Sequence, residues 1–190
     1  MVRSRVISIC VFGLAFITNW ANAQDPPTAC PRDVQFWADQ CEGYRAEICP
    51  DGMQSLARQV INRSIVHQWK RSDGSFETRA NFLAISDSAL VTALCAQLQD
   101  RTDPRDRAEA EYIALLLNVS VGALPLDASI SSQIEGTIGQ LVDSFEEALN
   151  QNRNLDTWQQ IVEQVNMGNI DAPSCPDPDQ IFKNVSPCGD

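Results

Sequence analysis

Apolar residues recur three and four positions apart along most of this chain, a spacing that places them on one face of an α-helix. The pattern marks six candidate helical segments. They run from Pro31 to Cys41, Met53 to Trp69, Ser86 to Leu98, Asp103 to near Gly122, Thr137 to Leu149 and Leu155 to Val165. No stretch alternates apolar and polar residues as a half-buried strand does. We therefore predict an all-α fold, a single disulfide-stapled domain of five or six helices, with sheet content close to nil.

Residue types that begin helices stand where the predicted helices begin. Pro31 suits a first helical position, and Ser86 can cap the helix that follows it. Asp103, which precedes a proline, suits the same capping role. Thr137 with Gln140 has the spacing of a capping box.

Turn residues separate the predicted helices. Pro50-Asp51-Gly52 and Asp73-Gly74 predict turns, and Gly168 suits the left-handed position after the last helix. Only a short polar turn, from Asn150 to Asn154, joins the last two helices, so we expect them to pack antiparallel. The apolar residues expected between them are Leu141, Val142, Phe145, Trp158, Ile161, Val162 and Val165.

Residues 1–23 have the three parts of a secretory signal peptide. Arg3 and Arg5 give a positive start, residues 6–17 are apolar, and Ala21-Asn22-Ala23 matches a small-x-small cleavage site. An apolar run of about a dozen residues is too short to span a bilayer, which needs about 20, although an uncleaved anchor is the alternative. We expect a protein secreted to the extracellular space or periplasm, without a membrane span after processing. Its helical domain would cover 24–174, followed by an irregular, disulfide-tied tail at 175–190.

The charge balance argues against one large class of partner. Without residues 1–23 the chain has 12 basic and 25 acidic residues, a formal charge of −13. Nucleic-acid binding depends on Lys and Arg that neutralise phosphates, so we expect no nucleic-acid partner. Solubility explains the acidity more simply than a specific cationic ligand does.

Six cysteines remain once Cys10 is removed with the signal peptide, and an even number in an exported chain predicts disulfides. The disulfide candidates are Cys30, Cys41, Cys49, Cys95, Cys175 and Cys188. Zinc sites favour cysteine pairs separated by about two to four residues, and no such pair occurs, so we expect no metal. The sequence leaves the pairing of the six cysteines open.

No group of residues forms a recognisable catalytic signature. His67 is the single histidine, so a catalytic triad or a histidine-containing zinc site would have to use it. No P-loop, dinucleotide, metalloprotease or nucleophile-elbow motif occurs. Glu109, Glu111 and Glu146 are expected on solvated outer faces of helices, where nothing marks a glycosidase pair. We therefore expect no cofactor and favour a protein that is not an enzyme.

Two tryptophans are candidates for an aromatic binding surface. Trp37 follows Phe36 between two cysteines, and Trp69 lies just before the Asp73-Gly74 turn. Exposed at the surface, these rings would offer a platform for a sugar or a peptide. Packing in the core is the alternative, and we favour it.

The order of several short motifs resembles a family of secreted bacterial domains. The family has a Phe-Trp-x-x-Gln-Cys segment near its N-terminus, an Arg-Ala helix that reaches Leu-Leu-Leu-Asn, a Leu-Asp connector, a Thr-Ile-Gly helix start and an Asn-x-Gly helix end. The matching residues here are Cys30, Phe36, Trp37, Gln40, Cys41, Arg107, Ala108, Asn118, Leu126, Asp127, Thr137, Ile138, Gly139, Ile161, Asn166 and Gly168. The resemblance covers nearly all of the chain after residue 23 and implies bacterial secretion and a single helical unit. The family has no assigned activity, so the resemblance implies no catalytic residue.

Three functions stay open on the sequence. The first is a secreted, non-enzymatic binding or structural module whose partner is a protein or a glycan. The second is a small extracellular hydrolase that uses carboxylates alone, and the third is a secreted inhibitor or effector. We favour the first, because the helical pattern is clear and no reactive group of residues accompanies it.

The signal-peptide prediction can be tested by the intact mass of the secreted protein. The mass is expected to correspond to a chain that begins at Gln24, because cleavage follows Ala23. A secreted chain that still contains Arg3 would contradict the prediction.

Overall fold

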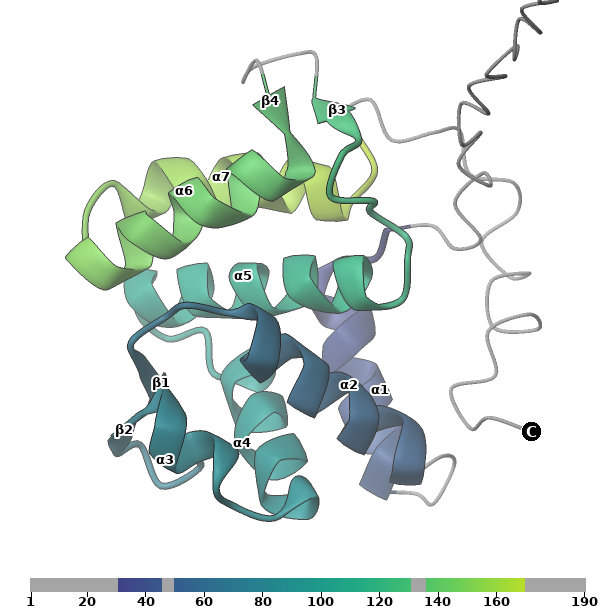
Figure 1. Cartoon of the computed structure of the whole chain (residues 1–190), viewed down its shortest axis with the longest axis vertical. Coiled ribbons are helices and arrows are strands. Elements are labelled where there is room, and N and C mark those ends of the chain that lie inside the picture. The colour runs from purple at the N-terminus through teal and green to yellow at the C-terminus, as the bar shows by residue number, and fades with distance from the viewer. Residues whose placement is uncertain (1–30, 46–49, 131–135, 170–190) are drawn as a thin grey trace, which may run out of the picture.

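The computed structural model describes residues 31–45, 50–130 and 136–169, which form a mainly helical domain (Figure 1). These ranges contain seven helices and four short strands. The helices are α1 (Val34–Arg45), α2 (Pro50–Arg63), α3 (Arg79–Leu83), α4 (Asp87–Gln99), α5 (Pro104–Ser120), α6 (Ile138–Gln151) and α7 (Leu155–Asn166). The strands form two antiparallel pairs, β1 (Gln68–Lys70) with β2 (Phe76–Thr78) and β3 (Ser129–Ile130) with β4 (Gly136–Thr137).

Helix α5 lies at the centre of the domain. Its residues 112–119 are all buried, as are several of its earlier residues. A helix that is apolar around most of its circumference needs neighbours on every side. Helices α6 and α7 cover one side of α5, and α1, α2 and α4 cover the other (Figure 1). The single hydrophobic core is therefore built around α5.

Each of the six candidate segments overlaps a helix of the structure, and several of the residues predicted to begin or end these helices do so. The side chains of Ser86 and Asp103 each accept a hydrogen bond from the backbone N–H three residues further on. Thr137 and Gln140 form the reciprocal capping box, and Gly168 follows α7 with a φ of 70°. The short helix α3 was not predicted.

The predicted starts of the first two helices are wrong. Helix α1 begins at Val34 rather than Pro31, because the Asp33 carboxylate accepts a hydrogen bond from the backbone N–H of Phe36, at 2.8 Å, and so caps the helix. Pro50 does not belong to a turn but is the first residue of α2. Proline is well tolerated there, because the first N–H groups of a helix have no partner within it.

The prediction that the second helix continues to Trp69 is also wrong, since α2 ends at Arg63. The N–H of Ser64 still donates to the Val60 carbonyl of the helix, but the next two N–H groups find partners elsewhere. The N–H of Ile65 donates to the Glu146 carboxylate at 2.9 Å, and that of Val66 donates to the Ser64 hydroxyl at 3.0 Å. The chain then enters strand β1, so the sheet content is small rather than nil and the fold is not strictly all-α.

The predicted packing of the last two helices is confirmed for its central residues. The Phe145 ring is fully buried and lies 6.4 Å from the Trp158 ring across the α6–α7 contact. The larger share of the contacts of α7 is with α5, and Phe145 also meets Tyr112 of α5 edge to face at 5.8 Å. The two helices therefore pack on α5 as a pair rather than on each other alone.

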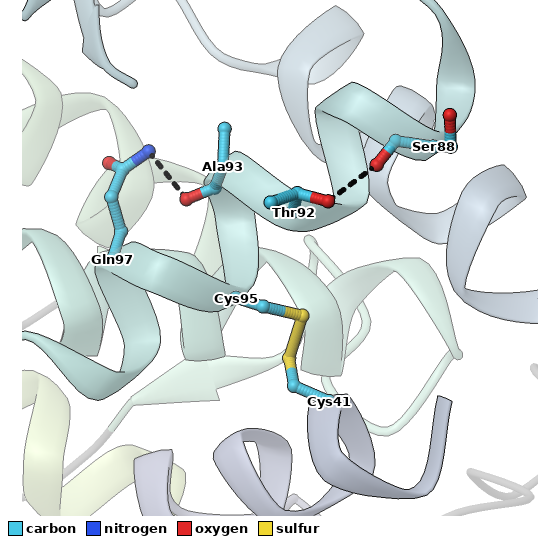
Figure 2. The surroundings of a disulfide bond; sticks show 6 residues. All are labelled: Cys41, Ser88, Thr92, Ala93, Cys95 and Gln97. Carbon is cyan, nitrogen blue, oxygen red and sulfur yellow. Dashed lines mark hydrogen bonds between the residues drawn. A yellow bond between two sulfur atoms is a disulfide. The ribbon is translucent and has the colours of Figure 1, made fainter. Parts of the chain in front are cut away.

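A disulfide fastens α1 to α4. It joins Cys41 to Cys95, whose Cα atoms are 5.6 Å apart, and both side chains are buried (Figure 2). The two cysteines are separated by 54 positions in the sequence. Closing a loop of this length in the unfolded chain is worth about 4 kcal/mol in the chain-entropy account of disulfide stability.

The side chain of Asn118 joins three segments of the chain at the end of α5. Its Oδ1 accepts hydrogen bonds from the Arg32 N–H at 2.9 Å and from the Trp37 indole N–H at 3.2 Å. Its Nδ2 donates to the Arg32 carbonyl at 2.8 Å and to Asn166 Oδ1 at 3.0 Å. The Asn118 side chain is fully buried, and its amide is fully hydrogen-bonded.

Asn166 extends this network. Its Nδ2 donates to the backbone carbonyl of Glu111 at 3.1 Å and to the Glu111 carboxylate at 2.9 Å. Buried amides are retained at low cost only when their partners are complete, as they are here. The two asparagines therefore fix α1 and α7 against opposite sides of α5.

Replacing Asn118 with Ala is expected to lower the free energy of unfolding by about 3–5 kcal/mol, because several buried partners would lose their hydrogen bonds. Chemical denaturation of the variant and the wild type would measure the change. Asn62→Ala is the matched control, since Asn62 is exposed at the end of α2, and it should change stability by less than about 0.5 kcal/mol. Equal stability of the two variants would show that the Asn118 network does not hold the helices.

Candidate functional site

The β1–β2 hairpin carries the side chains that define the candidate site. Its turn is closed by a hydrogen bond from the Arg71 N–H to the Ser75 carbonyl at 2.7 Å. Asp73 accepts hydrogen bonds from the N–H and the hydroxyl of Ser75, and Gly74 takes the left-handed conformation with a φ of 84°. An Asp-Gly turn of this kind favours a tight hairpin. The predicted turn at Asp73-Gly74 is thus confirmed, but it joins strands.

A polar hollow of about 370 Å³ lies between this hairpin, α4 and α5. We call it the hairpin pocket. It is lined by Lys70, Arg71, Ser72, Gly74, Ala96, Gln97, Gln99, Asp100, Asp106 and Glu109. Three separate stretches of the chain contribute to it, so the pocket exists only in the folded domain.

Lys70 is held between two carboxylates of the pocket. Its Nζ lies 2.8 Å from Asp106 Oδ1 and 2.9 Å from Asp100 Oδ2. The hydrogen bond to Asp106 keeps the pKa of Lys70 above its ordinary value, although burial acts in the opposite direction. The hydrogen bond from Lys70 in turn lowers the pKa of Asp100. At neutral pH Lys70 and Asp100 are therefore charged, and the ammonium group of Lys70 stays paired with the two carboxyl groups.

The backbone at Lys70 is fixed as well. Gln97 of α4 donates from Nε2 to the Lys70 carbonyl at 2.9 Å. On the same helix, Gln97 Nε2 also lies 3.5 Å from the Ala93 carbonyl (Figure 2). Strand β1 is thus tied to α4 through its backbone and to α5 through its lysine side chain, which leaves the pocket wall little freedom.

Glu109 forms the inner side of the pocket. Its Oε1 accepts a hydrogen bond from Arg105 Nε at 2.7 Å, and its side chain is largely buried. Burial raises the pKa of Glu109, while the neighbouring Arg105 guanidinium opposes the shift. The same guanidinium lies 5.8 Å from the centre of the Phe76 ring, within the range of a cation–π contact.

Phe76 is an exposed aromatic side chain of the hairpin, at 46% of its surface, although it is not itself among the residues that line the pocket. In the hairpin register it stands directly opposite Lys70, and residues directly opposite each other in an antiparallel pair point to the same face. Phe76 and Lys70 therefore share one face of the hairpin. Trp69, one position earlier, points to the other face and stacks on Phe82 at 5.8 Å.

The two candidate tryptophans of the aromatic surface are in the core. Trp37 and Trp69 are each only 3% exposed, so neither offers a platform to a ligand, and core packing is the correct interpretation. Phe76 was missed. The signal that identifies it is the Asp73-Gly74 turn flanked by aromatic residues on both sides, which is the pattern of a hairpin.

The prediction that Glu109 and Glu146 lie on solvated outer faces is wrong, because both are buried. Glu146 accepts hydrogen bonds from the Tyr112 hydroxyl and from the backbone N–H of Ile65. Tyr112 is also 2.8 Å from the Ser64 hydroxyl, and burial raises its pKa well above the ordinary value. This network holds the link between α2 and β1 against α5 and α6, which is a structural role.

Glu111 is a partly buried carboxyl group of α5 whose acid–base equilibrium is displaced. Burial raises its pKa to about 7, and the hydrogen bond from Asn166 opposes the shift. The negative charges of Glu163 on α7 and Asp33 before α1 raise the pKa further, and Arg101 lowers it. Glu111 therefore changes charge close to neutral pH.

The remaining sequence candidates divide into two groups. Cys41 and Cys95 form the disulfide described above, whereas Cys30, Cys49, Cys175 and Cys188 lie outside the described residues. His67 is exposed between α2 and β1, and its backbone N–H donates to the Asn150 side chain at 3.0 Å.

Similarity to known proteins does not assign a function to this pocket. No protein-family model, curated protein or solved structure matches the chain. Within the described ranges, no group of three His, Cys, Asp or Glu side chains is arranged to hold a metal ion. None of the helices described is long and apolar enough to cross a membrane.

The pKa of Glu111 predicts a pH dependence of stability. Because the folded-state pKa of about 7 exceeds the ordinary value of 4.5, the folded protein holds a proton that the unfolded chain releases between these values. The stabilisation is complete below pH 4.5 and falls as the pH rises towards 7, by about 3 kcal/mol in total. Glu111→Gln, which does not titrate, should therefore gain stability relative to the wild type as the pH rises from 4.5 to 8.

Denaturation of both proteins at the two pH values would measure this difference. Glu147→Gln, an exposed change on α6, is the control and should show the same difference from wild type at both. A Glu111→Gln protein that behaves like this control would show that Glu111 titrates in its ordinary range.

Proposed function

We propose that this chain is an exported, non-enzymatic binding module whose hairpin pocket takes a neutral sugar unit of a glycan. The observation that carries the proposal is a polar hollow of about 370 Å³ whose charged side chains pair with one another, next to an exposed aromatic ring on the same face of the hairpin as Lys70. Its volume lies in the usual range for small-ligand sites, about 300–1,000 Å³.

The pairing of charges in the pocket favours a neutral ligand. The ammonium group of Lys70 forms ion pairs with Asp100 and Asp106. Arg71 forms an ion pair with Glu77, with 2.6 Å between Nη2 and Oε2, and Arg105 forms one with Glu109. A charged ligand would have to compete with one of these ion pairs. Hydroxyl groups both donate and accept, so a sugar can bridge the outer sides of the paired groups without separating them.

Phe76 supports the choice of a sugar over other neutral ligands. Its exposed ring shares the hairpin face of Lys70 and is held in place by Arg105. An apolar ring beside directional polar groups matches the two kinds of surface on a pyranose ring, the C–H face and the hydroxyl edge. Gln97 and Gln99 add amide side chains at the opposite wall.

Export is supported by two independent features. The residues before Gln24 have the pattern of a signal peptide, and a buried disulfide joins α1 to α4. The resemblance to secreted bacterial domains points in the same direction and is part of this proposal. Each of these features concerns where the protein works, and none of them selects a ligand.

The hydrolase alternative depends on Glu111. A carboxyl group with a raised pKa near a second carboxylate, here Glu163, is the arrangement that glycosidases use. Against this role, Asn166 holds the Glu111 carboxylate at the α5–α7 contact. Glu163 does not line the hairpin pocket but a separate hollow formed by residues of α7. We therefore assign Glu111 a structural role.

The proposal can be tested by titrating the processed protein with maltohexaose, cellohexaose, xylohexaose and chitohexaose, followed by NMR. At least one is expected to shift the backbone resonances of residues 70–76 and 96–100. Phe76→Ala and Gln99→Ala should each weaken that binding about tenfold, equivalent to ~1.4 kcal/mol. Gln160→Ala, an exposed glutamine on α7 outside the pocket, is the matched control.

Three results would count against the proposal. Failure of all four sugars to bind would contradict a neutral glycan ligand. Shifts elsewhere, or a loss of affinity in Gln160→Ala equal to that in Phe76→Ala, would contradict the hairpin pocket as the site. Shorter sugars detected by mass spectrometry after incubation, and lost in Glu111→Gln, would instead support the hydrolase.

A further inference from the structure

Two buried polar atoms near the base of the hairpin have no hydrogen-bond partner among the described residues. They are Nε1 of Trp69 and Oε2 of Glu109. The Trp69 side chain comes from β1 and that of Glu109 from α5, and the two residues are 3% and 6% exposed. Buried polar groups are nearly always paired, so two unpaired atoms in one region require an explanation.

Both residues line the same small cavity behind the hairpin pocket. The cavity has a volume of about 10 Å³ and lies between β1, α4, α5 and α6. Its wall includes Trp69, Gln97 and Glu109. A single water molecule needs a space of about 10–15 Å³ on this measure, together with two or more polar partners. The cavity is thus of the size for one water molecule and has a donor and an acceptor in its wall.

We propose that this cavity binds one ordered water molecule, which accepts a hydrogen bond from the Trp69 indole and donates one to Glu109 Oε2. The indole N–H can only donate, and a carboxylate oxygen can accept, so one water molecule satisfies both. A larger ligand does not fit the volume. The assignment does not depend on the glycan proposal.

The water would join the hairpin to the central helix at a point where no direct bond is available. Trp69 is next to Lys70, and Glu109 lines both the small cavity and the hairpin pocket. Gln97 also lines both. The bound water therefore lies directly behind the pocket wall and supports its inner carboxylate.

Trp37 provides an internal comparison within the same protein. Its indole is buried to the same degree as that of Trp69, but its Nε1 donates directly to Asn118 Oδ1 at 3.2 Å. Burial alone therefore does not distinguish the two rings. A water contact should be found at Trp69 and not at Trp37.

Water-selective NOE and ROE spectra of the nitrogen-15-labelled, disulfide-bonded protein test the assignment. The Trp69 indole proton is expected to show a cross-peak to water whose NOE and ROE have opposite signs, which distinguishes a bound molecule from proton exchange. The Trp37 indole proton should show none. The cross-peak should persist in Glu109→Gln, which has no acid proton to exchange but keeps an acceptor oxygen.

The assignment would be overturned by the absence of a Trp69 cross-peak in the wild-type protein. A peak that disappears in Glu109→Gln would also overturn it, since the signal would then come from the carboxyl proton. Both outcomes are measured on the wild-type protein or on Glu109→Gln, in which no core side chain is shortened. A variant that fails to fold therefore cannot be mistaken for either outcome.

Discussion

The hydrogen bonds of Asn118 set the arrangement of the helices around α5. Apolar packing brings α1 and α7 against α5, but it is non-directional and tolerates sliding. The Asn118 amide binds both the N–H and the carbonyl of Arg32 and also reaches Trp37 and Asn166. A one-turn shift of either helix would leave these buried groups unpaired. The amide therefore selects one register from several that the apolar surface alone would permit.

The candidate site depends on the N-terminal end of α5, the end opposite to Asn118. Asp106 and Glu109 lie in the first two turns of α5 and face the hairpin, whereas Asn118 lies in the last turn. The hairpin could not form a stable unit by itself, since two-stranded hairpins are marginal in water. Its attachment through Lys70 and Gln97 gives it a fixed position on the helical core. The central helix thus determines both the register of the fold and the shape of the pocket.

The sequence predicted the helices because their stripes and caps are local signals, as at Ser86, Asp103 and Thr137. It did not predict the end of α2, since the hydrogen bond from Ile65 to Glu146 connects residues 81 positions apart. The burial of Glu109 and Glu146 was missed for the same reason. The Glu146 carboxylate binds Ile65 and Tyr112, which are distant in the sequence, and Glu109 is covered by the hairpin, although its partner Arg105 is only four residues away. The disulfide partner of Cys41 and the pocket around Lys70 are likewise products of tertiary contact.

The residues of the short sequence motifs and those that line the pocket occupy different parts of the fold. Trp37, Asn118 and Asn166 of the motifs meet in one network, and Gly139 approaches Leu126 closely, with its N–H 2.7 Å from the Leu126 carbonyl. A side chain at position 139 would crowd that carbonyl, since a Cβ there would lie 3.2 Å from it. These motif residues have structural reasons to be what they are. None of the pocket residues belongs to the motifs, so the motif residues account for the scaffold and not for the pocket.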